Sequence, residues 1–303
     1  MSFARFMELA LYDPAIGYYR RDRPRVGTAP GTDFFTASSS GPIFGELIAA
    51  ACGTLLGSEH DPRDYTFVEI GAEQQGGVLA EVTHPFGAVR TVRVGEPPAL
   101  AGRCVVFSNE LFDAQSFRRF VFRAGAWREL GVALRGEALA EIEIASSPPE
   151  VLPPTAPDGY RIDAPLAAAA LATEIAAQPW TGLFVTCDYG KSWRELTEAA
   201  PTGTARAYFR HTQSNDLLAR PGEQDLTCHV CWDWLADALA RGGFGATTVE
   251  SHEAFFIRHA AVFIEAASTT DAAQFSRRKL ALLQLLHPAH LGQKFQVLHA
   301  FRG

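Results

Sequence analysis

Short apolar runs recur along the chain with helical segments between them, and this spacing limits the folds that the chain can adopt. The clearest runs are Tyr65–Ile70, Cys104–Ser108 and Gly182–Cys187, and Val89–Val94 is predicted as a further strand. Short runs that are largely apolar are typical of strands buried on both faces. Because such strands alternate with helical segments, the sequence predicts an α/β fold with a mostly parallel sheet.

The segments around these runs carry helical and antiparallel signals. Alternating apolar and polar residues around Ala124-Gly125 predict a β-hairpin over Arg118–Leu134. Two further strands are predicted over Phe255–His259 and Phe295–Phe301. Helical spacing of apolar residues, or an Ala-rich composition, predicts helices at Phe3–Leu11, Ile43–Leu56, Val78–Thr83, Leu166–Ala177, Cys231–Arg241 and Asp271–Leu286.

Composition excludes several classes of protein. Hydrophobic residues make up 47% of the chain, which excludes a mainly disordered protein. The net charge of −7 does not suit a nucleic-acid binder, which needs a basic face. No window of about 20 apolar residues occurs, so we expect no membrane span. The N-terminus lacks the apolar stretch of a signal peptide, which predicts a cytoplasmic protein.

Three predicted strands end in polar residues. These ends are Glu69-Ile70-Gly71, Ser108-Asn109-Glu110 and Asp188-Tyr189-Gly190. In an open α/β sheet, ligands bind at the carboxyl ends of the strands. Carboxylates and an amide on one edge would suit a nucleoside-like ligand with hydroxyl and amino donors.

Several longer stretches resemble one protein family. The matching stretches are Ser2–Pro14 with Gly17-Tyr18-Tyr19, Gly31–Ser38, Phe44–Leu47, Ser108–Ala114, Asp188-Tyr189-Gly190, Gly203–Val230 and a tail with His287-Pro288, Gly292 and Phe295–Leu298. They are similar to the signatures of the S-adenosylmethionine-dependent arginine methyltransferases of respiratory complex I assembly, the mitochondrial dysfunction protein A family. The resemblance runs from residue 2 to about residue 300.

The resemblance implies a Rossmann-like class I methyltransferase, with S-adenosyl-L-methionine as cofactor and a protein arginine, such as one in a respiratory-complex subunit, as substrate. It implies an N-terminal helical cover over residues 1–60 and one Rossmann-like domain over 61–303, with an insertion at about 115–180. The cofactor would contact Glu69, Gly71, Glu96 and Asp188. The catalytic group would be Asn109, Glu110 and Asp113, with Asp33 closing over the site. Carboxylates suit this task because they match the guanidinium fork.

Two departures from the family pattern concern the cofactor site. The family's turn Glu-x-Gly-x-Gly-x-Gly has Glu73 and Gln75 at its second and third glycine positions here. A side chain where only glycine fits would crowd the ligand. The expected ribose-binding acid, Glu96, precedes the strand at Cys104 by too few residues for a usual parallel crossover. Either a helix and a strand are deleted there, or Val89–Val94 is not the second strand.

Other interpretations stay open at this point. Gly71 would also suit an ordinary tight turn, and Asn109, Glu110 and Asp113 would suit a helix start. A second hypothesis is a non-catalytic relative that acts as a protein-binding or assembly module. A third is a thiol oxidoreductase built on Cys228 and Cys231, two of five scattered cysteines. No metal site is predicted, and the oligomeric state, the substrate and the degree of methylation stay open.

Overall fold

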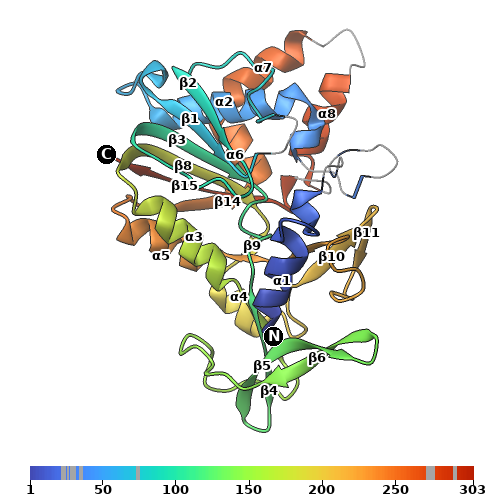
Figure 1. The fold of residues 1–303 in the computed structure, drawn as a ribbon. Helices are drawn as coiled ribbons and strands as arrows, with labels where there is room; N and C mark the ends of the chain where they lie inside the picture. Colours follow the sequence, from blue (N-terminus) through green and yellow to red (C-terminus); the bar gives the residue numbers. More distant parts are fainter. Residues whose placement is uncertain are drawn as a thin grey trace. The chain divides into compact units, whose positions relative to one another are not determined.

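The chain forms two compact units, each assembled from three separate segments (Figure 1). The computed structural model describes residues 1–21, 25, 27, 32–33, 37–72, 76–270, 277–288 and 292–303. The first unit comprises Met1–Phe35, Phe112–Ala172 and Gly190–Leu235. The second comprises Thr36–Leu111, Thr173–Tyr189 and Ala236–Gly303. Two of the boundaries between the units fall inside helices, in α3 (Leu166–Ala176) and in α5 (Trp232–Arg241).

The second unit is built on a six-stranded sheet in the order β14-β15-β8-β3-β1-β2. Strands β2, β1, β3 and β8 are mutually parallel, whereas β15 runs antiparallel to both β8 and β14. The predicted mostly parallel α/β sheet is therefore confirmed. The strands are β1 (Thr66–Ile70), β2 (Ala88–Val92), β3 (Gly102–Asn109), β8 (Trp180–Asp188), β14 (Thr248–Ser251) and β15 (Gln296–Arg302).

Helices of the second unit enclose an apolar core with this sheet. Phe44 and Leu47 of α2 are fully buried with Phe67 of β1, Phe107 of β3 and Phe256 of α6. Helix α2 begins with a proline in its first turn, where the missing N–H costs no hydrogen bond. The unit's helices are η2 (Ala37–Ser40), α2 (Pro42–Leu56), η3 (Pro62–Asp64), α6 (His252–His259), α7 (Ala261–Thr270) and α8 (Arg277–Leu286).

The connection from β2 to β3 crosses β1 without forming a helix or a strand. The predicted second strand is confirmed, since β2 pairs with β1 in parallel, and among the described residues the sheet ends there. A doubly wound sheet usually continues with a third strand outside the second. Between these two strands the usual helix and strand are replaced by the loop Arg93–Ala101, which makes the crossing alone. Such a loop reaches about 30 Å when extended, which is enough to return along a strand of about 17 Å.

The described residues of the first unit form three small sheets. The predicted hairpin is confirmed as β4 (Arg118–Arg123) and β5 (Ala126–Arg135), which belong to the four-stranded antiparallel sheet β6-β5-β4-β7. The other sheets are β11-β10-β12 and β13-β9. The remaining elements are α1 (Phe3–Tyr12), η1 (Tyr18–Arg20), β6 (Ala138–Ile144), β7 (Arg161–Ala164), β9 (Gly190–Lys191), α4 (Trp193–Glu198), β10 (Arg206–Phe209), β11 (Thr212–Ser214), β12 (Asp225–Thr227) and β13 (Val230–Cys231).

Two predictions of secondary structure were wrong. Phe255–His259, predicted as a strand, is the second half of α6, whose first turn is capped by the Ser251 hydroxyl. The sequence signal was too short to separate a buried helix from a strand. Val78–Thr83, predicted as a helix, forms turns instead, in which the N–H groups of Ala80 and Val82 bond to the carbonyls of Gly77 and Leu79, three residues earlier.

The other helix predictions agree with the structure to within a few residues, although residues 271–276 of the last one lie outside the described part of the chain. None of the helices among the described residues is both long and apolar enough to cross a membrane.

Candidate functional site

The carboxyl ends of β1, β3 and β8 lie side by side at one edge of the sheet in the second unit. The parallel register aligns Ile70 with Ser108 and Asn109 with Cys187. Glu69, Asn109 and Asp188 are therefore brought to the same edge, as the sequence predicts. Ligands of open parallel sheets bind at this edge.

The end of β1 is tied to the chain that follows it. The carboxylate of Glu69 is buried, and its Oε2 accepts a 2.7 Å hydrogen bond from the N–H of Val78. Gly77 lies so close that a Cβ there would be 2.4 Å from the same oxygen. Glu69 therefore holds residues 77–78 against the strand end, which leaves its carboxylate at the edge of the sheet.

Gly71 begins the turn after β1 in a conformation that favours glycine. Its φ is +84°, and its N–H donates a 2.9 Å hydrogen bond to the carbonyl of Val92. A Cβ at this position would lie 3.0 Å from Cδ1 of Leu111, so a side chain would be both strained and crowded. Glu73 and Gln75, the two departures from the glycine pattern, lie outside the described residues.

Asn109 and Glu110 form a polar pair at the end of β3. The Asn109 amide donates from Nδ2 to Oε1 of Glu110 at 3.0 Å, which fixes the orientation of the amide. Among the described residues, its Oδ1 is buried and has no hydrogen-bond partner. Glu110 has a φ of +51°, uncommon for a residue other than glycine, and its N–H bonds to the carbonyl of Cys187 at 2.9 Å.

The end of β8 contributes Asp188, which is fully buried. Its Oδ1 accepts a 2.8 Å hydrogen bond from the N–H of Tyr189. Next to it, the Ser108 hydroxyl donates to the Thr186 hydroxyl at 2.8 Å, joining β3 to β8. This buried pair could not be predicted from the sequence, since nothing in the spacing of residues so far apart marks a contact.

Glu96 lies on the long loop that follows β2. Its side chain is exposed, and its Oε2 accepts a 2.8 Å hydrogen bond from the N–H of Arg93, closing a turn. Glu96 therefore lies four residues after Val92, the last residue of β2. A cofactor contact by Glu96 stays a prediction.

Asp33 and Asp113 belong to the first unit. The Oδ2 of Asp33 accepts from the Tyr18 hydroxyl at 2.7 Å, and its Oδ1 accepts from the N–H of Arg210 at 2.9 Å. Arg210 and the next residue both have positive φ, in the tight turn between β10 and β11. Asp33 therefore stabilises a turn that is unfavourable for residues other than glycine. Asp113 is buried, and its carbonyl accepts from the N–H of Cys228.

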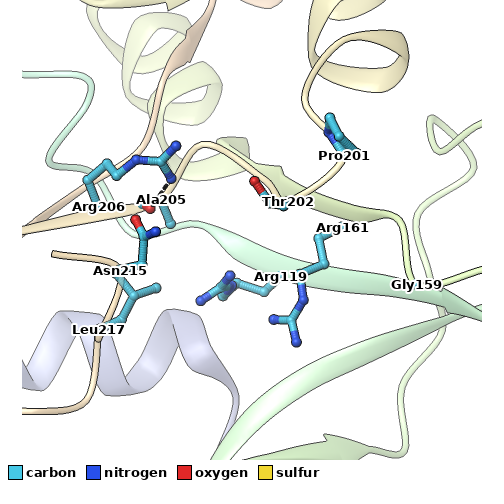
Figure 2. Close-up of a pocket in the computed structure, with 9 residues that line it drawn as sticks. All are labelled: Arg119, Gly159, Arg161, Pro201, Thr202, Ala205, Arg206, Asn215 and Leu217. Carbon is cyan, nitrogen blue, oxygen red and sulfur yellow. Dashed lines mark hydrogen bonds between the residues drawn. The ribbon is translucent and has the colours of Figure 1, made fainter.

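The first unit also contains a cavity of about 240 Å³ lined by three arginines (Figure 2). Arg119 pairs with the buried Asp163 at 2.9 Å, and Arg161 pairs with Glu141 at 2.7 Å. Arg206 donates a hydrogen bond to the carbonyl oxygen of the preceding residue at 2.6 Å. These arginines present N–H donors to the cavity, which do not match the N–H donors of a substrate guanidinium.

The comparisons with known proteins identify the family. The profile of a family described as "Putative S-adenosyl-L-methionine-dependent methyltransferase" matches residues 59–249. This chain belongs to that methyltransferase family. No curated protein matches the chain. The predicted cofactor, S-adenosyl-L-methionine, is confirmed at the level of the family. The family description does not extend to the arginine substrate or to the assembly of complex I, which stay predictions.

Two crystal structures of proteins from Burkholderia thailandensis share the fold of this methyltransferase. One, bound to S-adenosylhomocysteine, is 23% identical in sequence and has a TM-score of 0.86. The match covers 100% of this chain and 88% of the other protein's chain. The other, a native structure, is 22% identical with a TM-score of 0.81, covering 100% and 87%. At this identity the likeness concerns the fold, and it confirms the predicted Rossmann-like architecture.

The edge of the sheet fits the cofactor of the methyltransferase family on two observations. The backbone at Gly71 approaches the edge without a side chain, as a turn that cradles a ligand requires. Glu69 and Asp188 add carboxylates at the same edge, which can accept from hydroxyl and amino groups.

Cys228 and Cys231 lie just before the start of α5 in this methyltransferase. Both are thiols that take no part in a disulfide, and both are buried, with exposed fractions of 1% and 0%. Reactive cysteines are usually partly exposed and lie in electropositive surroundings. The thiol oxidoreductase hypothesis therefore has no support from the structure.

Proposed function

We propose that this protein transfers a methyl group from S-adenosyl-L-methionine to the guanidinium of an arginine in a protein substrate. The observation that carries the proposal is the pair at the end of β3. Asn109 presents a buried acceptor oxygen beside the carboxylate of Glu110, at the edge where parallel sheets bind ligands. The sequence motifs shared with the arginine methyltransferases support the same substrate.

A guanidinium presents planar N–H donors, so its binding site needs converging acceptors. The Glu110 carboxylate would hold the charge and the plane of the guanidinium, and the Asn109 oxygen would accept a further N–H. The cofactor supplies an electrophilic methyl group on a sulfonium. Methylation replaces one guanidinium proton, which leaves to solvent, while the sulfonium becomes a thioether. The residues therefore act mainly by placing the reacting nitrogen in line with the methyl group.

The remaining predicted site residues have separate roles in this proposal. Glu69, Gly71, Glu96 and Asp188 bind the cofactor, and Asp113 contacts the substrate. Asp33 is proposed as a positioning residue, because both of its carboxylate oxygens already accept hydrogen bonds within the first unit. It would act by holding the turn at Arg210 in place.

Calorimetric titration with S-adenosyl-L-methionine tests the cofactor step, and methyl transfer to arginine-containing peptides, read by mass spectrometry, tests the substrate. We expect Glu110→Gln to lower methyl transfer on the order of 100-fold while the cofactor still binds. The matched control is Glu137→Gln, the same substitution in an exposed turn of the first unit, which should leave both readouts unchanged. Absence of cofactor binding at millimolar concentration would end the enzyme proposal.

A second candidate function is a non-catalytic relative that acts as a protein-binding or assembly module. The observation that favours it is the loop Arg93–Ala101, which stands in place of a helix and a strand beside the ribose-binding position. A wall shortened in this way would bind adenosine less tightly. The calorimetric titration separates the two functions, since a pure module shows no saturable heat with the cofactor.

We further propose a cytoplasmic location and a respiratory-complex subunit as substrate, both from the sequence analysis. Cell fractionation tests the location. Comparing methylarginine on respiratory-complex subunits between cells with and without this protein tests the substrate. Unchanged methylation on every subunit would remove that substrate and leave the methyltransferase proposal in place.

A further inference from the structure

Three side chains of the second unit converge away from the carboxyl edge of the sheet. Glu250 lies on β14, His299 on β15 and His259 at the last position of α6. The antiparallel register pairs Thr248 with His299 and Glu250 with Val297, so Glu250 and His299 are diagonal neighbours on one face. Helix α6 brings His259 to the same face.

The three groups point their ligand atoms at one spot. Nε2 of His259 lies 2.9 Å from Oε1 of Glu250, and Nε2 of His299 lies 3.2 Å from the same oxygen. All three atoms lie within 4.8 Å of one another. In a tetrahedral zinc site with bonds of about 2.1 Å, ligand atoms are roughly 3.4 Å apart, which is close to the 2.9 Å and 3.2 Å separations found here.

The cluster is largely shielded from solvent and packs against an aromatic ring. The side chains of Glu250, His259 and His299 are 5%, 14% and 12% exposed. The buried ring of Phe255 contacts both imidazoles, at centroid distances of 5.2 Å and 5.8 Å. A buried carboxylate oxygen that lies close to two imidazole nitrogens is a ligand set suited to transition metals.

We propose that Glu250, His259 and His299 bind a divalent transition-metal ion of the zinc class, through Oε1 and the two Nε2 atoms. The ion would join the C-terminal end of α6 to β14 and β15, and a water molecule would complete the coordination. This role concerns the fold of the second unit and is independent of methyl transfer.

Arg258 is compatible with the ion because it occupies the other side of the carboxylate. Its Nη1 contacts Oε2 of Glu250, which leaves Oε1 to the histidines. A carboxylate held on one oxygen by a neighbour and bound to metal on the other is an ordinary monodentate ligand. Binding through Nε2 requires a neutral imidazole with its hydrogen on Nδ1, so a hydrogen that joins Nε2 to Oε1 in the metal-free protein moves to Nδ1 or leaves to solvent.

Titration of the metal-free full-length protein with Zn²⁺, and with Co²⁺ followed by its visible absorption, tests the proposal. We expect one ion per chain, a tetrahedral cobalt spectrum and a higher midpoint of thermal unfolding. His259→Gln and His299→Gln should each weaken binding more than about 10-fold. His60→Gln, which removes a histidine bonded to Tyr65 elsewhere in the same unit, should leave binding unchanged.

Circular dichroism of each metal-free variant checks that the fold is kept. Lack of saturable binding by the native protein would overturn the proposal without reference to any variant. Equal binding by the native protein, His259→Gln and His299→Gln would overturn it as well, because the ion would then lie elsewhere.

Discussion

The hydroxyl of Tyr19 donates a 2.9 Å hydrogen bond to Oδ1 of Asp225, a carboxylate buried in the first unit. Burial raises the pKa of Asp225 to about 7, more than the hydrogen bond from Tyr19 and the nearby Arg25 lower it. The same burial raises the pKa of Tyr19 well above its usual value. Near neutral pH, this buried pair therefore titrates at the carboxylate.

The pH dependence of stability follows from that shift. An acid whose pKa is raised on folding favours the folded state at low pH and loses this contribution as the pH rises from about 4 to about 7. Asp225→Asn keeps an oxygen that accepts from Tyr19 but cannot ionise. We expect it to remove a slope of up to ~1.4 kcal/mol per pH unit in that interval and to be more stable than the native protein at pH 8.

Urea unfolding between pH 4 and pH 8 measures this difference. The exposed Asp237→Asn is the control, and it should follow the native curve. Parallel curves for Asp225→Asn and the native protein would show that Asp225 titrates normally.

Gly71→Val should abolish binding of S-adenosyl-L-methionine. Valine would be strained at a φ of +84° and would press on Leu111, displacing the turn that cradles the cofactor. Gly57 also has a positive φ, of +75°, but no atom lies within 4 Å of a Cβ built there. Gly57→Val therefore introduces backbone strain without touching the cofactor site. In calorimetry this variant should bind S-adenosyl-L-methionine with native affinity. Unchanged affinity in Gly71→Val would place the cofactor elsewhere.

Arg302 should contribute strongly to the stability of the second unit. Its guanidinium donates to the carbonyls of Ala176 and Gly242 at 2.6 Å and to that of Gln178 at 2.9 Å, and it lies over the ring of Trp180. Arg302→Ala would leave these carbonyls unsatisfied, so we expect a loss of about 3 kcal/mol in the free energy of unfolding. The exposed Arg93→Ala should change it little; similar losses in both would assign the effect to charge alone.

Replacing Cys228 and Cys231 together by alanine should leave methyl transfer and cofactor binding unchanged, because both thiols are buried and neither forms a disulfide. Thiol titration of the native protein with a colorimetric reagent should show neither cysteine reacting before unfolding. If the double variant lost methyl transfer while it still bound the cofactor with native affinity, a redox role for the two cysteines would be supported instead.

The fold could be predicted where the signal was local. Apolar runs such as Tyr65–Ile70 become inner strands because a parallel sheet buries both faces. The sequence also showed that the segment between β2 and β3 was too short for the usual crossover, which left open whether a helix and a strand are missing or Val89–Val94 is not the second strand. The parallel pairing of β2 with β1 excludes the second alternative. The strand predicted over Phe255–His259 was wrong because five residues fit both the helical and the strand periodicity. The serine that caps the helix, Ser251, was the signal that could have distinguished the two.

The candidate site was predicted in part for a similar reason. Strand ends place Glu69, Asn109 and Asp188 together as a consequence of topology. Partnerships over long distances in the sequence could not be predicted, such as Tyr19 with Asp225 or Glu250 with His299. These pairs depend on register and on helix placement, which single residue types do not specify.

The shortened crossing from β2 to β3 has a consequence for how the sheet meets its surroundings. Because the order ends at β2 in the described part of the chain, the outer backbone groups of this strand face no further strand there, and Val89 is partly exposed. Such an edge can pair with a strand of another molecule and lead to aggregation. Strand β2 is short and carries Arg90 at its centre. This charge therefore supplies the protection against intermolecular pairing that a covering strand provides in a complete sheet.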